Sequence, residues 1–112
     1  MNSPGDEVFP THSAKRLTIL LGARDHDHHG SLYVHLIQRA RKVNLAGATA
    51  FEAYEGYGNS GQIHRTHSIS NDAPMSIVII DRAERIDAYL RDAADLLENV
   101  VITMTDVEIV EL

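Results

Sequence analysis

The run Met75-Ser76-Ile77-Val78-Ile79-Ile80, which follows Pro74, decides how the rest of this sequence folds. β-Branched residues favour strands, and a proline is tolerated where a strand begins. Side chains alternate between the two faces of a strand, so Ile77 and Ile79 fall on one face and Val78 and Ile80 on the other. The run therefore predicts a strand that is apolar on both faces.

A helix is predicted directly after this strand. Asp81 is expected to cap the helix, with Glu84 at the capping-box position. Apolar residues then fall at helical spacing, at Ile86, Tyr89, Leu90, Ala93 and Leu97. After the helix, a fourth strand is expected over residues 100–104, and a short extra C-terminal strand over 107–110, beyond a break at residues 105–106.

Upstream, the same reasoning predicts two more strands and one helix. Alternating apolar residues predict a first strand from Arg16 to Gly22 and a second over residues 48–57. Between them, Ser31 is suited to begin a helix. Its apolar stripe is Leu32, Leu36, Ala40 and Val43. The order βαββαβ is typical of a ferredoxin-like α+β sandwich. Residues 1–15 show no period and are predicted to form a disordered N-terminal arm, so the domain spans residues 16–112.

The composition describes one small soluble domain. The chain has 112 residues, a net charge of −6 and no cysteine. Nucleic-acid binders need clustered basic residues, so this charge argues against that function. The lack of thiols excludes disulfides, a thiolate nucleophile and a cysteine-ligated zinc. No apolar run approaches the roughly 20 residues of a membrane span, so no membrane insertion is expected. The first residues carry no secretory signal pattern, and a cytoplasmic location is expected.

Aliphatic residues on both faces of the first and third strands predict an assembly. Two amphipathic helices can cover only one face of a four-stranded sheet. At about 25 cal/mol per Å² of apolar surface, leaving the second face in water forfeits on the order of several kcal/mol, comparable to the stability of a small domain. Another copy of the chain is the simplest cover, so we expect an obligate homo-oligomer with its long loops near subunit boundaries.

Three glycines end the second predicted strand, in the pattern Gly56-x-Gly58-x-x-Gly61. The spacing matches a dinucleotide-binding fingerprint, for which Asp81 stands where an acidic residue is required. That fingerprint needs a helix to begin inside it, whereas residues 62–71 are polar and aperiodic. Two interpretations stay open: the backbone amides form a nest for an anion, or the glycines only turn the chain out of the strand.

A second polar segment, Asp25-His26-Asp27-His28-His29, contains oxygen and imidazole ligands suited to zinc, copper or nickel. His26, His28 and His29 are the candidate metal ligands. Adjacent loop residues point apart, however, and closed metal sites usually draw on residues distant in sequence. A solvated loop is the competing interpretation.

Several short motifs form an ordered set that covers nearly the whole chain from residue 17 onward. They are Leu17-Thr-Ile-Leu-Leu-Gly22, Ser31-Leu-Tyr33, Leu45-Ala-Gly-Ala-Thr49, Glu55-Gly-Tyr-Gly58, Ile63-His64, Ser76 to Asp81 and Glu84-Arg-Ile86. This set resembles the DUF190 family of small PII-like proteins, which are related in fold to the nitrogen-regulatory PII signalling proteins. The resemblance implies a homotrimer in which residues 58–73 correspond to the mobile T-loop. It also implies a signalling protein, not an enzyme, that binds adenine nucleotides in subunit clefts and controls a membrane transporter or an enzyme through this loop.

The chain departs from the PII pattern where phosphates are bound. Before the last strands it has only Glu98-Asn99-Val100, without the glycine and lysine of the PII loop, and its C-terminus Glu108-Ile-Val-Glu-Leu112 is acidic. We therefore expect an effector with few phosphates, such as AMP, ADP or a cyclic nucleotide, and no required cofactor. The expected ligand-binding residues are Gly56, Tyr57, Gly58, Gly61, His64, Arg65 and Arg24.

Two alternatives remain. A small enzyme of the dimeric α+β barrel type also pairs ferredoxin-like sheets, but the spacing of Ser60, His64 and Asp72 does not support a catalytic set, and no catalytic residue is predicted. The other alternative is a metal-binding protein that uses the segment from Asp25 to His29.

Overall fold

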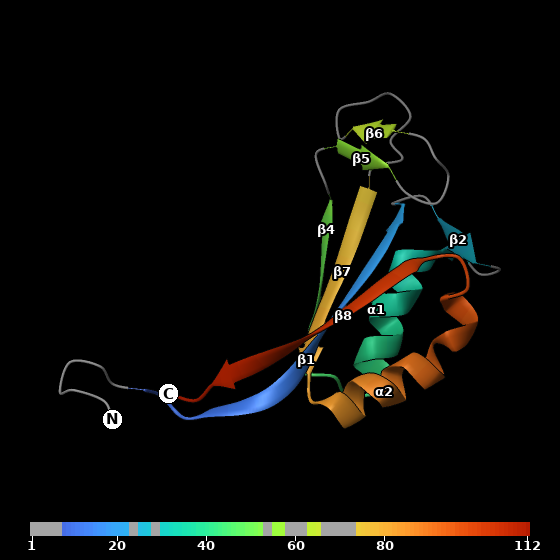
Figure 1. Cartoon of the computed structure of the whole chain (residues 1–112). Coiled ribbons are helices and arrows are strands. Elements are labelled where there is room, and N and C mark those ends of the chain that lie inside the picture. Colours follow the sequence, from blue (N-terminus) through green and yellow to red (C-terminus); the bar gives the residue numbers. More distant parts are fainter. Residues whose placement is uncertain (1–7, 23–24, 28–29, 53–54, 58–62, 66–73) are drawn as a thin grey trace.

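The computed structural model describes residues 8–22, 25–27, 30–52, 55–57, 63–65 and 74–112 (Figure 1). The strands are β1 (Thr11–Gly22), β2 (His26–Asp27), β3 (Gly30–Ser31), β4 (Ala48–Glu52), β5 (Glu55–Tyr57), β6 (Ile63–Arg65), β7 (Pro74–Asp81) and β8 (Val101–Val110). The helices are α1 (Leu32–Lys42), α2 (Ala83–Asp92) and the 3₁₀ helix η1 (Ala94–Leu96). None of the described helices is long and apolar enough to cross a membrane.

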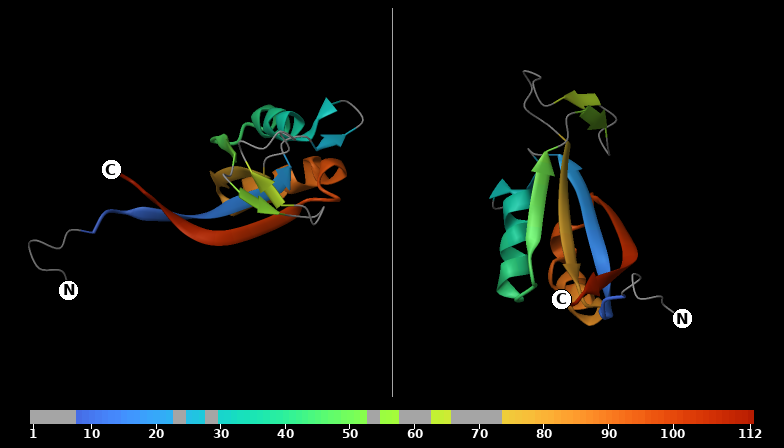
Figure 2. Two further views of the ribbon diagram at one scale, coloured as in Figure 1. Left: turned by 90° about the horizontal axis from the view of Figure 1, so that it is seen from above. Right: turned by 90° about the vertical axis from the view of Figure 1, so that its left-hand side faces the viewer.

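Four antiparallel strands form the main sheet in the order β4-β7-β1-β8. α1 connects β1 to β4 and α2 connects β7 to β8, so each helix joins two strands that are not neighbours in the sheet. Both helices lie on the same face of the sheet (Figures 1 and 2). This arrangement confirms the predicted ferredoxin-like α+β fold.

The core lies between the sheet and the two helices. Leu17 and Ile19 of β1 and Ile77 and Ile79 of β7 have no exposed surface. Of the predicted apolar stripes, Leu32, Leu36, Ala40, Ile86, Tyr89 and Ala93 are buried. Val43, Leu90 and Leu97 are partly buried and pack against this core. The helical and strand periods read from the sequence therefore identify the residues that pack together.

Polar contacts fasten α1 to α2. The buried hydroxyl of Tyr89 donates to the carbonyl oxygen of Leu36 at 2.8 Å, and burial raises the pKa of this hydroxyl. Arg39 Nη1 donates to the carbonyl oxygen of Asp92 at 2.7 Å and lies 3.2 Å from Asp95 Oδ1. The hydrogen bond to Asp95 raises the pKa of the guanidinium. These contacts fix how the two helices lie on the sheet.

The predicted cap of α2 is wrong. The N-cap residue is Arg82, whose side chain makes no capping hydrogen bond. Asp81 is buried, and its carboxylate accepts the backbone N–H of Ala46 at 2.9 Å and that of Arg82 at 2.7 Å. Asp81 therefore ties the connection before β4 to the beginning of α2. Ser31 does stand at the N-cap of α1, as expected, but its hydroxyl makes no capping hydrogen bond.

β1 and β8 are both longer than the sequence predicts. The first strand was expected from Arg16, whereas β1 begins at Thr11, so residues 11–15 of the predicted arm lie in a strand. β8 runs without the expected break at residues 105–106, and there is no separate C-terminal strand among the described residues 101–112. The cause is cross-strand pairing, because β1 pairs with β8 from Thr11 opposite Val110 to Leu20 opposite Val101. Pairing of β1 with β7 stops at Lys15 opposite Asp81.

The outer part of this pair projects beyond the helices as a two-stranded segment (Figures 1 and 2). We call residues 11–14 of β1 together with residues 107–110 of β8 the β1–β8 ribbon. Thr11 Oγ1 donates to Glu108 Oε1 at 3.2 Å, and Lys15 forms an ion pair with Asp106 at the base of the ribbon. Polar cross-strand pairs of this kind give no apolar periodicity, so the sequence reads as irregular there.

None of the described helices or strands covers the face of the main sheet that points away from α1 and α2 (Figure 2). We call it the open face. Its described residues alternate with the core residues along the four strands: Arg16, Thr18, Leu20, Thr49, Phe51, Ser76, Val78, Ile80, Val101, Thr103 and Thr105. Leu20 is 44% exposed and Phe51 is 53% exposed. Apolar residues thus lie on both faces of the sheet, as the sequence predicts, while their cover by another copy stays a prediction.

Candidate functional site

A small hairpin stands where the main sheet meets the glycine-rich stretch. β5 pairs with β6 in a separate two-stranded sheet, with Gly56 opposite His64 and Glu55 opposite Arg65. β5 also contacts β7. The hairpin lies beyond the ends of β4 and β7, at the far end of the molecule from the β1–β8 ribbon (Figure 1). Residues 55–57 therefore meet residues 63–65 and the strand β7 at this end of the sheet.

The hairpin contains four of the seven expected ligand-binding residues. Gly56 and Tyr57 lie in β5, and His64 and Arg65 lie in β6. The other three, Gly58, Gly61 and Arg24, lie outside the described residues. Of the predicted loop 58–73, the structure describes only residues 63–65, which form β6. The second strand, expected to run unbroken over residues 48–57, is divided into β4 and β5, which belong to different sheets.

The segment proposed as a metal site begins with a structural turn. Asp25 Oδ2 accepts the backbone N–H of Gly22 at 2.9 Å, and the carbonyl oxygen of Asp25 accepts the N–H of Leu32 at 2.8 Å. β2 and β3 follow as a short hairpin, with His26 opposite Ser31. Gly30 has a φ of 126°, a conformation that side chains with a Cβ rarely adopt. Asp25 therefore closes the turn after β1.

No group of three metal-ligating side chains is found among the residues that the structure describes. His28 and His29 lie outside those residues, so a metal site with His26 stays a prediction.

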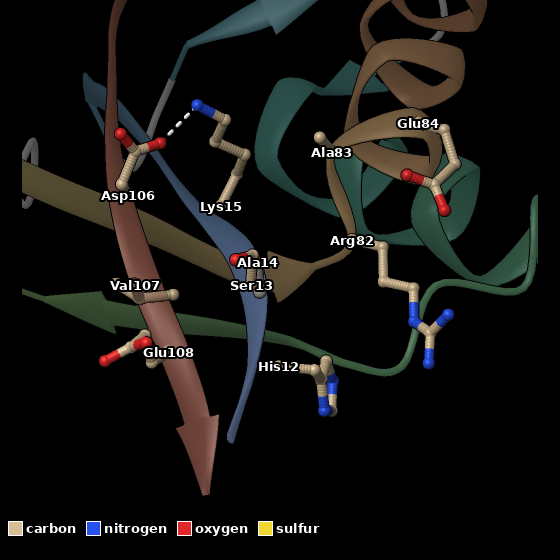
Figure 3. Close-up of a pocket in the computed structure, with 10 residues that line it drawn as sticks. All are labelled: His12, Ser13, Ala14, Lys15, Arg82, Ala83, Glu84, Asp106, Val107 and Glu108. Carbon is tan, nitrogen blue, oxygen red and sulfur yellow. Dashed lines mark hydrogen bonds and ion pairs between the residues drawn. The ribbon is translucent and has the colours of Figure 1, made fainter. Parts of the chain in front are cut away.

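A groove of about 750 Å³ lies at the opposite end of the molecule from the hairpin. Its walls are residues 12–15 of β1, residues 106–108 of β8 and residues 82–84 at the beginning of α2 (Figure 3). Lys15 forms an ion pair with Asp106 inside the groove, and His12 Nδ1 lies 2.8 Å from Oε1 of Glu111, which is not a lining residue. Arg82, Glu84 and Glu108 also line the groove, so its walls carry both signs of charge.

The sequence did not predict this groove. Its residues come from three distant segments, and it exists only because β1 and β8 pair beyond β7. The one available signal is the matching of polar residues between residues 11–15 and 106–111, which becomes visible only when the strand register is known.

The fold defines the class of protein. A solved structure of CPII, a nitrogen regulatory PII-like protein from Thiomonas intermedia K12 bound to ADP, AMP and bicarbonate, matches with a TM-score of 0.72 and 17% identity over 93% of this chain and 94% of that chain. A structure from Thermus thermophilus described as a PII-like signaling protein matches with a TM-score of 0.68 and 16% identity over 89% of this chain and 92% of that chain. The fold is PII-like.

The sequence comparisons define the family. The model of the DUF190 family, described as uncharacterized ACR, matches residues 14–109. A UPF0166 protein from Aquifex aeolicus (strain VF5) is 33% identical over 101 residues, which cover 88% of this chain and 95% of that protein. The chain belongs to the DUF190 family, and the resemblance read from the ordered motifs is confirmed.

Proposed function

We propose that this protein is a PII-like regulatory protein, not an enzyme, which assembles as a homotrimer and binds an adenine nucleotide with few phosphates. The nucleotide binds in a cleft between copies, near the β5–β6 hairpin. Ligand binding biases the conformation of residues 58–73, and a membrane transporter or an enzyme recognises that conformation.

The pairing of β5 with β6 is the observation that carries this proposal. The pairing brings Gly56 of β5 opposite His64 of β6, and Arg65 is the next residue of β6. A glycine lets a ligand approach the backbone closely, and a guanidinium is suited to charge-assisted hydrogen bonds with phosphate oxygens. The hairpin therefore combines the residue types that a small phosphate-containing ligand requires.

Two features support an effector with few phosphates. The connection between η1 and β8 consists only of residues 97–100, which is too short for a long phosphate-binding loop. The acidic residues Glu108 and Glu111 contact Thr11 and His12, at the far end of the sheet from the hairpin. The ligands named for the CPII structure include ADP and AMP, and they support the same chemical class for this chain.

Isothermal titration of the native protein with AMP, ADP, ATP and cyclic AMP tests the proposal. We expect AMP, ADP or cyclic AMP to bind more tightly than ATP. A ligand at about 100 times its dissociation constant should also stabilise the fold by about 2.7 kcal/mol. Absence of binding by every nucleotide, or tightest binding by ATP, would contradict the proposal.

A matched pair of variants locates the site. Arg65→Ala removes the guanidinium from β6, and we expect it to weaken nucleotide binding by about tenfold or more, because charge-assisted hydrogen bonds contribute about 1.5–3 kcal/mol. Arg91→Ala removes an exposed guanidinium from the last turn of α2 and is the control, with unchanged affinity expected. Equal effects of the two substitutions would argue against a site at the hairpin.

A further inference from the structure

β1 continues past the end of β7 as one strand of the β1–β8 ribbon. β7 pairs with β1 only as far as Asp81 opposite Lys15, whereas β8 pairs with β1 as far as Thr11. After Asp81 the chain leaves the sheet and begins α2. Among the described residues, residues 11–14 of β1 therefore have a strand on one side and no strand on the other.

The hydrogen-bond pattern shows which backbone groups point to the unpaired side. In an antiparallel pair, alternate residues direct their N–H and C=O groups toward the partner strand, and the residues between them direct these groups away. The N–H of Glu111 donates to the carbonyl oxygen of Pro10 at 2.8 Å, so the even-numbered residues of β1 point these groups toward β8. The N–H and C=O groups of Thr11 and Ser13 therefore point away from β8, and no described residue forms a hydrogen bond with them.

These free backbone groups border the groove at the beginning of α2. The groove lies between residues 12–15 of β1 and residues 82–84 (Figure 3). Thr11 and Ser13 are both exposed. Donors and acceptors that alternate along the edge of a strand are complementary to another extended backbone, which can add to the sheet through main-chain hydrogen bonds. A strand added beside Thr11 and Ser13 would continue the line of β7.

The charges of the groove favour a basic segment. The charged lining residues are Lys15, Arg82, Asp106, Glu84 and Glu108. Lys15 is paired with Asp106, so one cation and two carboxylates remain. His12 adds no net positive charge, because it is paired with Glu111. The chain as a whole has a net charge of −6, which attracts a basic segment and repels a second acidic copy.

We propose that the free edge of β1 at Thr11 and Ser13 is a docking site for an extended basic segment of a partner protein, which adds to the sheet as a strand beside β1. Main-chain groups of the segment bond to both residues, and its basic side chains lie near Glu84 and Glu108. The site is at the far end of the sheet from the β5–β6 hairpin (Figure 1). It is therefore separate from the proposed nucleotide site and does not depend on nucleotide binding.

Nuclear magnetic resonance of the whole chain tests the site with a short peptide of alternating lysine and valine. We expect the amide signals of Thr11 and Ser13 to shift as the peptide is added, and their hydrogen exchange to slow. A peptide with the same side chains but with every backbone nitrogen methylated keeps the charge and lacks the N–H donors. We expect this methylated peptide to leave both signals unchanged.

Two substitutions at one position separate the backbone from the side chain. Ser13→Pro removes an N–H that makes no bond within the described chain, so the fold should be kept. Ser13→Ala keeps the N–H and is the matched control. We expect Ser13→Pro to weaken peptide binding by about tenfold or more, because the acceptor on the peptide loses its donor. Ser13→Ala should bind as the native protein does, and both variants should keep the native circular dichroism spectrum.

Four outcomes would overturn the proposal. Equal affinity of the Ser13→Pro and Ser13→Ala variants rules out pairing with the edge of β1. Equal affinity of the native protein for the methylated peptide rules out main-chain pairing without any substitution. Equal binding of a peptide of alternating glutamate and valine rules out a basic partner. Amides of Thr11 and Ser13 that are protected from exchange without peptide, and that lose this protection on dilution, show that a second copy occupies the edge instead.

Discussion

The two faces of the main sheet are built from alternate residues of the same strands, yet they have different surroundings. Ile19 and Ile77 have no exposed surface, whereas Leu20, the next residue of β1, is 44% exposed and Ile80 of β7 is 40% exposed. These four residues have similar hydrophobicity, and only the position of the helices distinguishes them. The difference teaches that the strands carry two apolar faces, of which one is covered within the chain and the other is the face on which we propose that a second copy packs.

The largest expected effect distinguishes the two faces directly. Ile19→Ala should lower the free energy of unfolding by about 2–5 kcal/mol at every protein concentration, because it leaves a cavity in the core. Leu20→Ala, on the open face, should cost less than about 1 kcal/mol in the single chain and act mainly on assembly. Urea denaturation over a range of protein concentrations measures both. If Ile19→Ala and Leu20→Ala lowered the free energy of unfolding equally at every protein concentration, the two faces would not differ as we propose.

A second substitution tests the polar link at the edge of the covered face. Asp81→Ala deprives the amides of Ala46 and Arg82 of their acceptor, and we expect a loss of about 1–3 kcal/mol. Asp87→Ala removes an exposed carboxylate from α2 and should change stability by less than about 0.5 kcal/mol. Thermal denaturation of both variants is the measurement. A native-like melting temperature for Asp81→Ala would show that other groups position the beginning of α2.

The third prediction concerns the helix layer and its pH dependence. Tyr89→Phe removes the hydrogen bond to Leu36 and should cost about 1 kcal/mol near neutral pH. Burial raises the pKa of the Tyr89 hydroxyl, so the folded state keeps a proton that the unfolded state loses above pH ~10. The stability contributed by this hydroxyl is therefore fully present below pH ~10 and is lost as pH rises toward the pKa in the folded protein.

Unfolding free energies of the native protein and of Tyr89→Phe, measured between pH 7 and pH 11, test this sign. The difference between the two proteins should shrink above pH ~10, because only the native protein carries the titrating hydroxyl. A difference that grows with pH would show that the hydroxyl is not held in its protonated form by burial.

The smallest expected effect is at the base of the β1–β8 ribbon. Lys15→Ala removes the ion pair with Asp106, whose side chain is 84% exposed, and should cost about 0–1 kcal/mol. Denaturation at low and high salt measures the change, which salt should reduce. A loss of several kcal/mol would show that this pair determines the stability of the ribbon.

The core of the fold could be predicted because its signals are local. Leu36 in α1 and Ile86 in α2 each belong to a stripe that repeats at helical spacing. Leu17 and Ile19 lie two residues apart on one face of β1, so the burial of each follows from its own segment. The extent of β1 and β8 could not be predicted, because polar residues near position 11 join the sheet only by pairing with residues near position 110. Strand boundaries of this kind depend on a partner that is distant in sequence.

The candidate site was predictable in part for the same reason. The glycine pattern indicated where the chain leaves the sheet, and the family resemblance added His64 and Arg65 to the expected site. His64 lies opposite Gly56 because of the register in which β5 and β6 pair. Neither residue determines this register by itself. The groove beside α2 could not be predicted, because the polar residues that match across its strands can be paired only when the strand register is known.

The mass of the native protein in solution tests the central claim most directly, because both the subunit clefts and the cover of the open face require assembly. Size-exclusion chromatography with light scattering should give about three times the 12.4 kDa of one chain at micromolar concentration. A mass of two chains would favour the dimeric α+β barrel arrangement. A mass of 12.4 kDa would contradict the account, since the open face would then remain in water.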